Sequence, residues 1–262
     1  MASIFDNYWN QVKDILGEKP EQQVASKSTA IRFSAEQRPS VFGSDAVQRL
    51  YGALEGDGWK EQKQAGSNWV WREGIPQLRN RPREVALERL IAFIGNKHQK
   101  IWTWQMSTSS GIQMDDKTKN NSTNKRRAID LVRNNGNGSY TFVELKVGSD
   151  NPLYALFELI GYALACLIAR TKGWKGSNPA NDVLRASEIR LVVLGPDSWY
   201  RYKTKGRHGG FKEYDIQWIL PPLIEGLNLL AGDKPRMSIS FQRYMSPTEM
   251  AADEIIANAP HW

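Results

Sequence analysis

Two apolar segments joined by the sequence Asn-Gly-Asn-Gly constrain the fold of this chain more than any other feature. Residues 128–134 read AIDLVRN, residues 140–148 read YTFVELKVG, and residues 135–138 lie between them as NGNG. Asn and Gly tolerate the positive φ angles of tight hairpin turns, and β-branched and aromatic side chains favour the flanking strands. The sequence therefore predicts an antiparallel β-hairpin over residues 128–148.

The length of the turn sets the register of this hairpin. A three-residue loop, Gly136-Asn137-Gly138, pairs residues whose numbers sum to 274, which places Asp130 opposite Glu144 with Lys146 on the same face. A two-residue loop would shift the pairing by one residue, although strand twist could still bring these groups together. The other face is expected to be uniformly apolar, with Ile129, Leu131, Val143, Leu145 and Val147.

The segments around the hairpin alternate between helix and strand patterns. Residues 83–96 have apolar side chains at helical spacing, and residues 152–170 are apolar on most faces, as in a buried helix. Residues 100–107 and 188–195 are rich in strand-forming side chains. The order helix, strand, strand, strand, helix, strand predicts an α/β domain with a central mixed sheet flanked by helices.

The N-terminal part of the chain is expected to form an extension. Residues 1–80 contain no motif with a recognisable function, and we expect them to be mostly helical. Helices are predicted within residues 1–25 and over residues 34–51, and the sequence NWVWRE at residues 68–73 predicts a strand.

The remainder, residues 81–262, is expected to form one main domain. Its core covers residues 83–195, and residues 196–262 are expected to add mainly helices. One further strand is predicted between those helices, at residues 237–244.

Composition excludes several classes of site. Cys166 is the only cysteine, so an intrachain disulfide and a cysteine zinc cluster are excluded, and three scattered histidines do not favour a zinc site. A formal charge of +7 mildly favours an anionic partner such as nucleic acid. The first residues lack the pattern of a signal peptide, and no segment is convincing as a membrane span. We therefore expect a cytoplasmic protein without a membrane partner.

The charged face of the hairpin has two interpretations. It is either a solvated surface, with Lys146 offsetting two carboxylates, or a site for a divalent metal ion. Like charges directly opposite each other destabilise a sheet, and a bound cation removes that repulsion. Asp130 and Glu144 would suit Mg²⁺ or Mn²⁺, which prefer oxygen ligands. Lys146 would then steady or deprotonate an attacking water, or neutralise the charge developing on a phosphoryl group.

These residues resemble the signature of the PD-(D/E)xK nuclease superfamily, which has the restriction-endonuclease-like fold. Asp130 matches the aspartate of that motif, Glu144 the second acid and Lys146 the lysine, while Ile129 stands where a proline often precedes the aspartate. The family core has the order αβββαβ, which is the order predicted over residues 83–195. The resemblance implies a metal-dependent nuclease with catalytic Asp130, Glu144 and Lys146.

The resemblance also implies roles for residues around the motif. The backbone carbonyl of Val147 is expected as a further metal ligand. A glutamate on the first helix often faces the metal, and Glu84 is preferred over Glu88 because apolar residues follow it at helical spacing. Glu158 and Tyr162 have the spacing of a Gln-x-x-x-Tyr motif, and Glu158 needs a partner such as Lys146 because it lies in an apolar helix.

Two basic segments are candidates for contacts with nucleic acid. The polar loop over residues 108–127 leads directly into the Asp130 strand and is interpreted either as a phosphate-binding loop or as an ordinary solvated loop. Residues 201–210 form a second basic, glycine-rich segment that could contact a backbone or stack on a base. The candidate binding residues in the first loop are Lys117, Lys119, Lys125, Arg126 and Arg127.

The leading functional hypothesis is an Mg²⁺- or Mn²⁺-dependent hydrolase of phosphodiester bonds, with a DNA endonuclease as the favoured kind and DNA favoured over RNA. The alternative is a non-catalytic module that binds nucleic acid or protein on the same fold. A third alternative assigns the function to the N-terminal 80 residues. The oligomeric state is left open between a monomer and a homodimer.

Overall fold

A computed structural model describes most of the chain and leaves out the loops between its elements. The described residues are 4–17, 42–56, 68–74, 76, 82–97, 99, 101–108, 128–148, 152–173, 182–203, 210–213, 215–248 and 250–262. The candidate binding residues Lys117, Lys119, Lys125, Arg126 and Arg127 all lie outside these ranges.

A five-stranded mixed sheet with the strand order β1-β2-β3-β4-β7 forms the centre of the protein. Strand β2 is antiparallel to both of its neighbours, β1 and β3, whereas β3, β4 and β7 run parallel to one another. The bounds are β1 Trp102–Ser107, β2 Ala128–Gly136, β3 Ser139–Leu145, β4 Glu188–Pro196 and β7 Arg236–Tyr244. The predicted α/β class with a central mixed sheet is confirmed.

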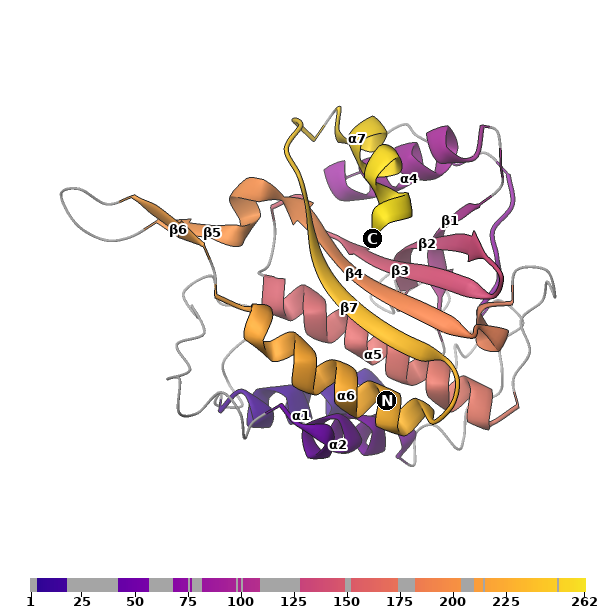
Figure 1. The fold of residues 1–262 in the computed structure, drawn as a ribbon, viewed down its shortest axis with the longest axis vertical. Helices are drawn as coiled ribbons and strands as arrows, with labels where there is room; N and C mark the ends of the chain where they lie inside the picture. Colours follow the sequence, from indigo (N-terminus) through magenta and orange to yellow (C-terminus); the bar gives the residue numbers. More distant parts are fainter. Residues whose placement is uncertain are drawn as a thin grey trace, which may run out of the picture.

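Helices cover both faces of the sheet, as Figure 1 shows. Helices α1, α2, α5 and α6 share one apolar core with the sheet, and α4 and α7 share a second core on the opposite face. The bounds of these helices are α1 Ile4–Ile15, α2 Ser44–Glu55, α4 Arg83–Gly95, α5 Pro152–Thr171, α6 Leu220–Ala231 and α7 Ala251–Asn258. Because both faces are covered, the central strands are buried on both sides.

The body of the β2–β3 hairpin has the predicted register. Residues 131–134 pair in order with residues 143–140, so the paired numbers sum to 274. This register puts Asp130 level with Glu144, as the sequence predicts.

The turn of the hairpin differs from the predicted three-residue loop. Gly136 pairs with Ser139, so the loop has only two residues, Asn137 and Gly138, with φ angles of 52° and 74°. Positive φ at both positions is the geometry of the type I′ turn, which matches the twist of hairpin strands. The register shifts between Asn134 and Gly136, and this bulge restores the pairing that a two-residue loop alone would have displaced.

Helix α5 is the central helix of the larger core. All but a few of its side chains are buried, including Cys166. Its length and composition would allow it to cross a membrane, and 89% of its most apolar window is buried inside the protein. The sequence-based expectation of a buried helix is confirmed.

The N-terminal residues contribute two helices to the larger core. In α1, Phe5, Tyr8 and Val12 are spaced at helical intervals and are buried. Helix α2 begins at Ser44, later than the predicted residue 34. It lies so close to α6 that a Cβ on Gly226 would be 2.7 Å from the Val47 side chain. The first part of the chain is therefore packed against the domain.

Residues 69–72 are not the strand that the sequence predicts. The Trp69 amide donates to the Ser107 carbonyl at 2.8 Å, and the Arg72 amide donates to the Thr103 hydroxyl at 2.9 Å. The segment thus follows the outer edge of β1 through two separated contacts, and one of them uses a side chain instead of a backbone carbonyl. Such spacing does not form a ladder of backbone hydrogen bonds.

The strand predicted at residues 237–244 is confirmed, and it belongs to the main sheet instead of being an addition to the core. Residues 236–244 form β7, which pairs with β4 along its whole length and completes the main sheet. A short hairpin, β5 (Arg201–Lys203) with β6 (Phe211–Glu213), projects from the body of the domain (Figure 1). Buried Met237 and Ile239 alternate with exposed neighbours in β7, which explains why this segment is a strand.

Candidate metal centre

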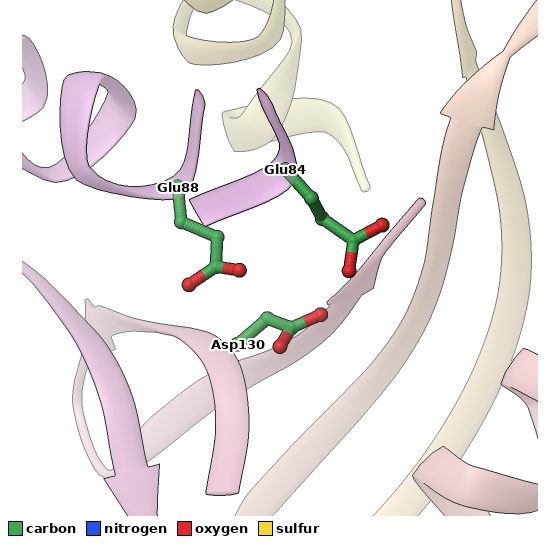
Figure 2. Close-up of side chains that lie close together, drawn as sticks. All are labelled: Glu84, Glu88 and Asp130. Carbon is green, nitrogen blue, oxygen red and sulfur yellow. The ribbon is translucent and has the colours of Figure 1, made fainter. Parts of the chain in front are cut away.

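Three carboxylates from two separate elements meet at the side of the sheet covered by α4. Glu84 and Glu88 project from the first turns of α4 towards Asp130 on β2, as Figure 2 shows. Ligand oxygens of the three side chains lie within 4.8 Å of one another. We call Glu84, Glu88 and Asp130 the acidic triad.

Packing of α4 brings its two acids to the strand. Glu84 and Glu88 are four residues apart and therefore share one face of the helix. Leu87 and Ile91 are buried in the same core as Leu131 of β2, so the helix must lie against the hairpin. Glu88 is almost fully buried, whereas 27% of the Glu84 side chain is exposed. The sequence-based preference for Glu84 is therefore too narrow, because the structure brings both glutamates to Asp130.

Gln105 of β1 connects two members of the acidic triad. Its side-chain amide donates to Glu88 Oε2 at 2.6 Å and to Asp130 Oδ1 at 3.4 Å. The other oxygen of Asp130 accepts from the Leu145 amide at 2.9 Å. Sequence reasoning missed Gln105, although it is the one long polar side chain in this strand, and that was a usable signal.

The backbone at Gln105 is strained. Its φ of 47° places a non-glycine residue in the left-handed region, which costs about 1–3 kcal/mol unless the surroundings compensate. Trp104 and Met106, its neighbours on either side, belong to opposite cores, so the alternation of β1 is interrupted there. The paired residues Leu131 and Ile129 change sides in the same way, so Ile129 does not join the predicted apolar face.

Lys146 lies between the acidic triad and a second pair of carboxylates. Its Nζ is 2.6 Å from Glu144 Oε1, 3.3 Å from Glu158 Oε2 and 4.0 Å from Glu84 Oε1. The Lys146 side chain is only 7% exposed. Lys146 therefore bridges acids from β3, α5 and α4 in one buried network.

Glu158 has the partner that the sequence predicts. Besides its ion pair with Lys146, it accepts a hydrogen bond from the Tyr162 hydroxyl at 3.3 Å. Both residues project from α5, on the opposite face of the sheet from α4. The network thus crosses the end of the hairpin and joins the two helix layers.

The interpretation of the charged hairpin face as a solvated surface is wrong. Asp130, Glu144 and Lys146 are 8%, 2% and 6% exposed, because helices cover both sides of the strands. Glu144 is not among the three acids whose ligand oxygens converge; it is held instead by Lys146. Val147, whose carbonyl was expected as a ligand, lies just beyond β3 and is partly exposed.

Five carboxylates surround one lysine in this network, and burial makes their charges costly. Burial, followed by the charge of Asp130, raises the pKa of Glu88 to about 9. Burial likewise raises the pKa of Asp130 to about 7, although Lys146 opposes the shift. Burial and the charges of Asp130 and Glu158 raise the pKa of Glu144 well above its ordinary value.

Lys146 remains a cation in this network. Burial alone would lower the pKa of Lys146, but the charges of Glu144, Glu158 and Asp130 outweigh burial and raise it well above the ordinary value. Of the roles predicted for Lys146, a persistent positive charge favours steadying the water or neutralising charge over removal of a proton from water.

The donor set fits a hard divalent cation. Among the described residues no donor reaches Glu144 Oε2, although this atom is buried. Buried polar atoms without partners are rare, and an unpaired carboxylate oxygen beside further carboxylates is the environment that a cation stabilises. The exposed part of Glu84 offers a path from solvent to the acidic triad. All of these ligands are carboxylate oxygens, which suit Mg²⁺ or Mn²⁺.

Comparisons of the chain with protein-family models, with curated proteins and with solved structures find no match. The function is therefore argued from the residues of this site.

Proposed function

We propose that the protein is a metal-dependent nuclease that hydrolyses phosphodiester bonds, with DNA as the favoured substrate and internal cleavage as the favoured mode. The observation that carries the proposal is the buried excess of carboxylates around Lys146. Such an arrangement is costly for stability alone, because like charges out of water repel one another strongly. It becomes favourable when a divalent cation compensates the charge.

The acidic triad would hold the cation, and Glu144 would contribute its buried Oε2, the oxygen that Lys146 does not contact. Bound Mg²⁺ or Mn²⁺ supplies a Lewis acid for a phosphate oxygen and lowers the pKa of a bound water. Gln105 keeps Glu88 and Asp130 in place through its two hydrogen bonds.

Lys146 acts on the substrate through its positive charge. It neutralises the charge that develops on the phosphoryl oxygens, or it orients the attacking water as a hydrogen-bond donor. Glu158 and Tyr162 support it, because Glu158 contacts Lys146 Nζ and Tyr162 donates to Glu158. A positioned cation of this kind needs no change in its own protonation during the reaction.

The order of the core elements supports a restriction-endonuclease-like arrangement. Helix α4 is followed by β1, β2, β3, α5 and β4, which is the αβββαβ order of that fold. The acids lie on α4, β2 and β3, and the lysine follows directly after β3, as the resemblance implies. The formal charge of +7 suits a polyanionic substrate.

Cleavage assays test this function directly. The full chain is incubated with supercoiled plasmid, single-stranded DNA and RNA, each with Mg²⁺, Mn²⁺ or EDTA. We expect nicking or linearisation of the plasmid that requires the metal and is lost in Asp130→Asn. Asp253→Asn, at an exposed aspartate of α7, is the matched control and should cleave normally.

Three outcomes would contradict parts of the proposal. Undiminished cleavage by Asp130→Asn would exclude the proposed metal centre. Binding of nucleic acid without metal-dependent cleavage of any substrate would identify a non-catalytic binding module instead. Faster cleavage of RNA than of DNA would correct the substrate class while keeping the chemistry.

A further inference from the structure

A cavity of about 290 Å³ lies at the C-terminal end of α4, between this helix, β1 and the segment 69–74. Three aromatic residues line it, namely Trp71, Phe93 and Trp102. Phe93 is partly exposed, whereas Trp71 and Trp102 are only 4% and 1% exposed and belong to opposite cores. Arg72, Glu73 and Lys97 supply its charged residues. The volume is at the small end of the range for ligand pockets and suits a ligand of one or two rings.

The wall formed by Trp102 is fixed in place. Asn96 accepts from the Trp102 amide and donates to the Trp102 carbonyl, both at 2.8 Å. The indole lies against the end of α4 so closely that a Cβ on Gly95 would be 2.5 Å from the ring. Glycine at this position is therefore what lets the ring pack there.

The wall formed by Trp71 is also anchored. The residues on either side of it are held to β1, since the Trp69 amide bonds to Ser107 and the Arg72 amide to Thr103. The Trp71 ring packs edge-on against Tyr140, with ring centroids 6.3 Å apart. Fixed walls lower the entropic cost of binding, because fewer side chains must be ordered when a ligand enters.

The charges at the cavity favour an aromatic ligand that carries an anion. Lys97 Nζ lies 5.9 Å from the centroid of the Phe93 ring, and Arg72 is exposed. A planar ring would stack on the partly exposed Phe93 while its negative group meets these two cations. A nucleotide combines both features in one unit.

The cavity and the acidic triad share two elements. Helix α4 carries Glu88 as well as Phe93, about 8 Å apart by the rise of an α-helix. Strand β1 carries Gln105 as well as Trp102, about 10 Å apart by the rise of a strand. A strand of nucleic acid with one phosphate at the triad could therefore place a nearby base at the cavity.

We propose that this cavity binds one unpaired nucleotide of the nucleic-acid strand, with the base stacked on Phe93 and the phosphate near Arg72 and Lys97. The inference rests on the proposed function for the identity of the strand. The same chemistry would be offered by a free nucleotide, so the experiment separates the two sources.

Binding is measured by fluorescence anisotropy in EDTA, so that no cleavage occurs, with short labelled single-stranded DNA. A set of oligonucleotides carries one abasic site at successive positions. For wild type we expect one position at which loss of the base weakens binding by about fivefold or more, since stacking contributes about 1–3 kcal/mol per base. Phe93→Leu should weaken binding of the intact strand similarly and remove the dependence on that position.

Matched substitutions at the other side of the molecule serve as controls. Phe241→Leu, at a partly buried phenylalanine of β7, should keep the abasic dependence. Lys97→Gln tests the phosphate contact and should weaken binding of every oligonucleotide by a similar factor. Its control is Lys172→Gln, just after α5, which should bind as wild type does.

The outcomes distinguish this inference from the proposed function. Metal-dependent cleavage by wild type with no abasic effect at any position would overturn the cavity assignment and leave the nuclease proposal standing. An abasic effect that needs Phe93, in a protein that never cleaves, would support the cavity and overturn the nuclease. Binding of free dAMP that Phe93→Leu abolishes, with no abasic effect, would overturn the assignment to a strand.

Discussion

Replacement of Glu88 by glutamine separates stability from function at the metal centre. Glu88 is almost fully buried, accepts a hydrogen bond from Gln105 and lies beside Asp130 and Glu84. Glutamine has the same shape, can still accept from Gln105 and carries no charge. We expect Glu88→Gln to stabilise the metal-free protein at alkaline pH and to abolish its stabilisation by Mg²⁺.

The expected gain in stability of Glu88→Gln follows from the pKa of Glu88, which burial and the charge of Asp130 raise from 4.5 to about 9. A carboxyl with a raised folded-state pKa contributes stability below its unfolded pKa, and this contribution is lost as the pH rises towards the folded value. At pH 8 the loss has an upper bound of about 5 kcal/mol, at about 1.4 kcal/mol per pH unit. Because the buried cluster can relax and admit water when Glu88 ionises, we expect about 2–3 kcal/mol, or a rise in Tm of about 5–10 °C.

The assay is thermal unfolding of wild type and Glu88→Gln from pH 5 to pH 9, in EDTA and in Mg²⁺. In EDTA the difference in Tm should be small at pH 5 and grow towards pH 9. Magnesium at a hundred times its dissociation constant should stabilise wild type by about 2.7 kcal/mol, seen as a higher Tm, and leave the variant unchanged. Glu225→Gln, at an exposed glutamate of α6, is the control and should behave as wild type.

The reasoning would be refuted by either of two results. A lower Tm for Glu88→Gln at pH 8 in EDTA would show that the ionised cluster is not repulsive. Equal stabilisation of both proteins by Mg²⁺ would show that Glu88 is not part of a metal centre.

Three further substitutions test neighbouring parts of the argument. Lys146→Gln should destabilise the metal-free protein by about 3–5 kcal/mol in urea unfolding at pH 8, because it leaves buried carboxylates without their cation; an unchanged midpoint would contradict the ion network. Gln105→Leu should weaken Mn²⁺ binding by about 10–100-fold in calorimetric titration, as loss of an outer-shell partner does, and equal affinity would remove Gln105 from the site. Gly226→Ala should lower stability by about 1–3 kcal/mol despite its better helix propensity, since the new Cβ meets Val47, and a higher Tm would contradict the close packing of α2 on α6.

The hairpin shows how far local sequence signals reach. The alternating strands and the Asn-Gly turn are local features, so they predict β2, β3 and the level placement of Asp130 and Glu144. The register is nevertheless reached through a two-residue turn and a bulge instead of a three-residue loop. A three-residue loop and a two-residue turn with a bulge put the same residues opposite each other in the strands, and no local sequence pattern separates the two.

The positions of the residues around Asp130, Glu144 and Lys146 depend on contacts between segments that are distant in the sequence. Sequence placed Glu84 and Glu88 on one helix face, but the burial of Leu87 and Ile91 beneath the sheet decided that both acids reach Asp130. Gln105 enters the site because its backbone is left-handed, which no propensity of this residue predicts.

Periodicity and turn chemistry were thus sufficient for the α/β class, the order of the core elements and the candidate acids with their lysine. They act over a few residues and can be read without the fold. The convergence of α4, β1, β2 and α5, the burial of the charges and the cavity beside Trp102 were decided by tertiary packing. Distances between side chains far apart in the sequence, and the pKa values that depend on them, exist only once the helices close over both faces of the sheet.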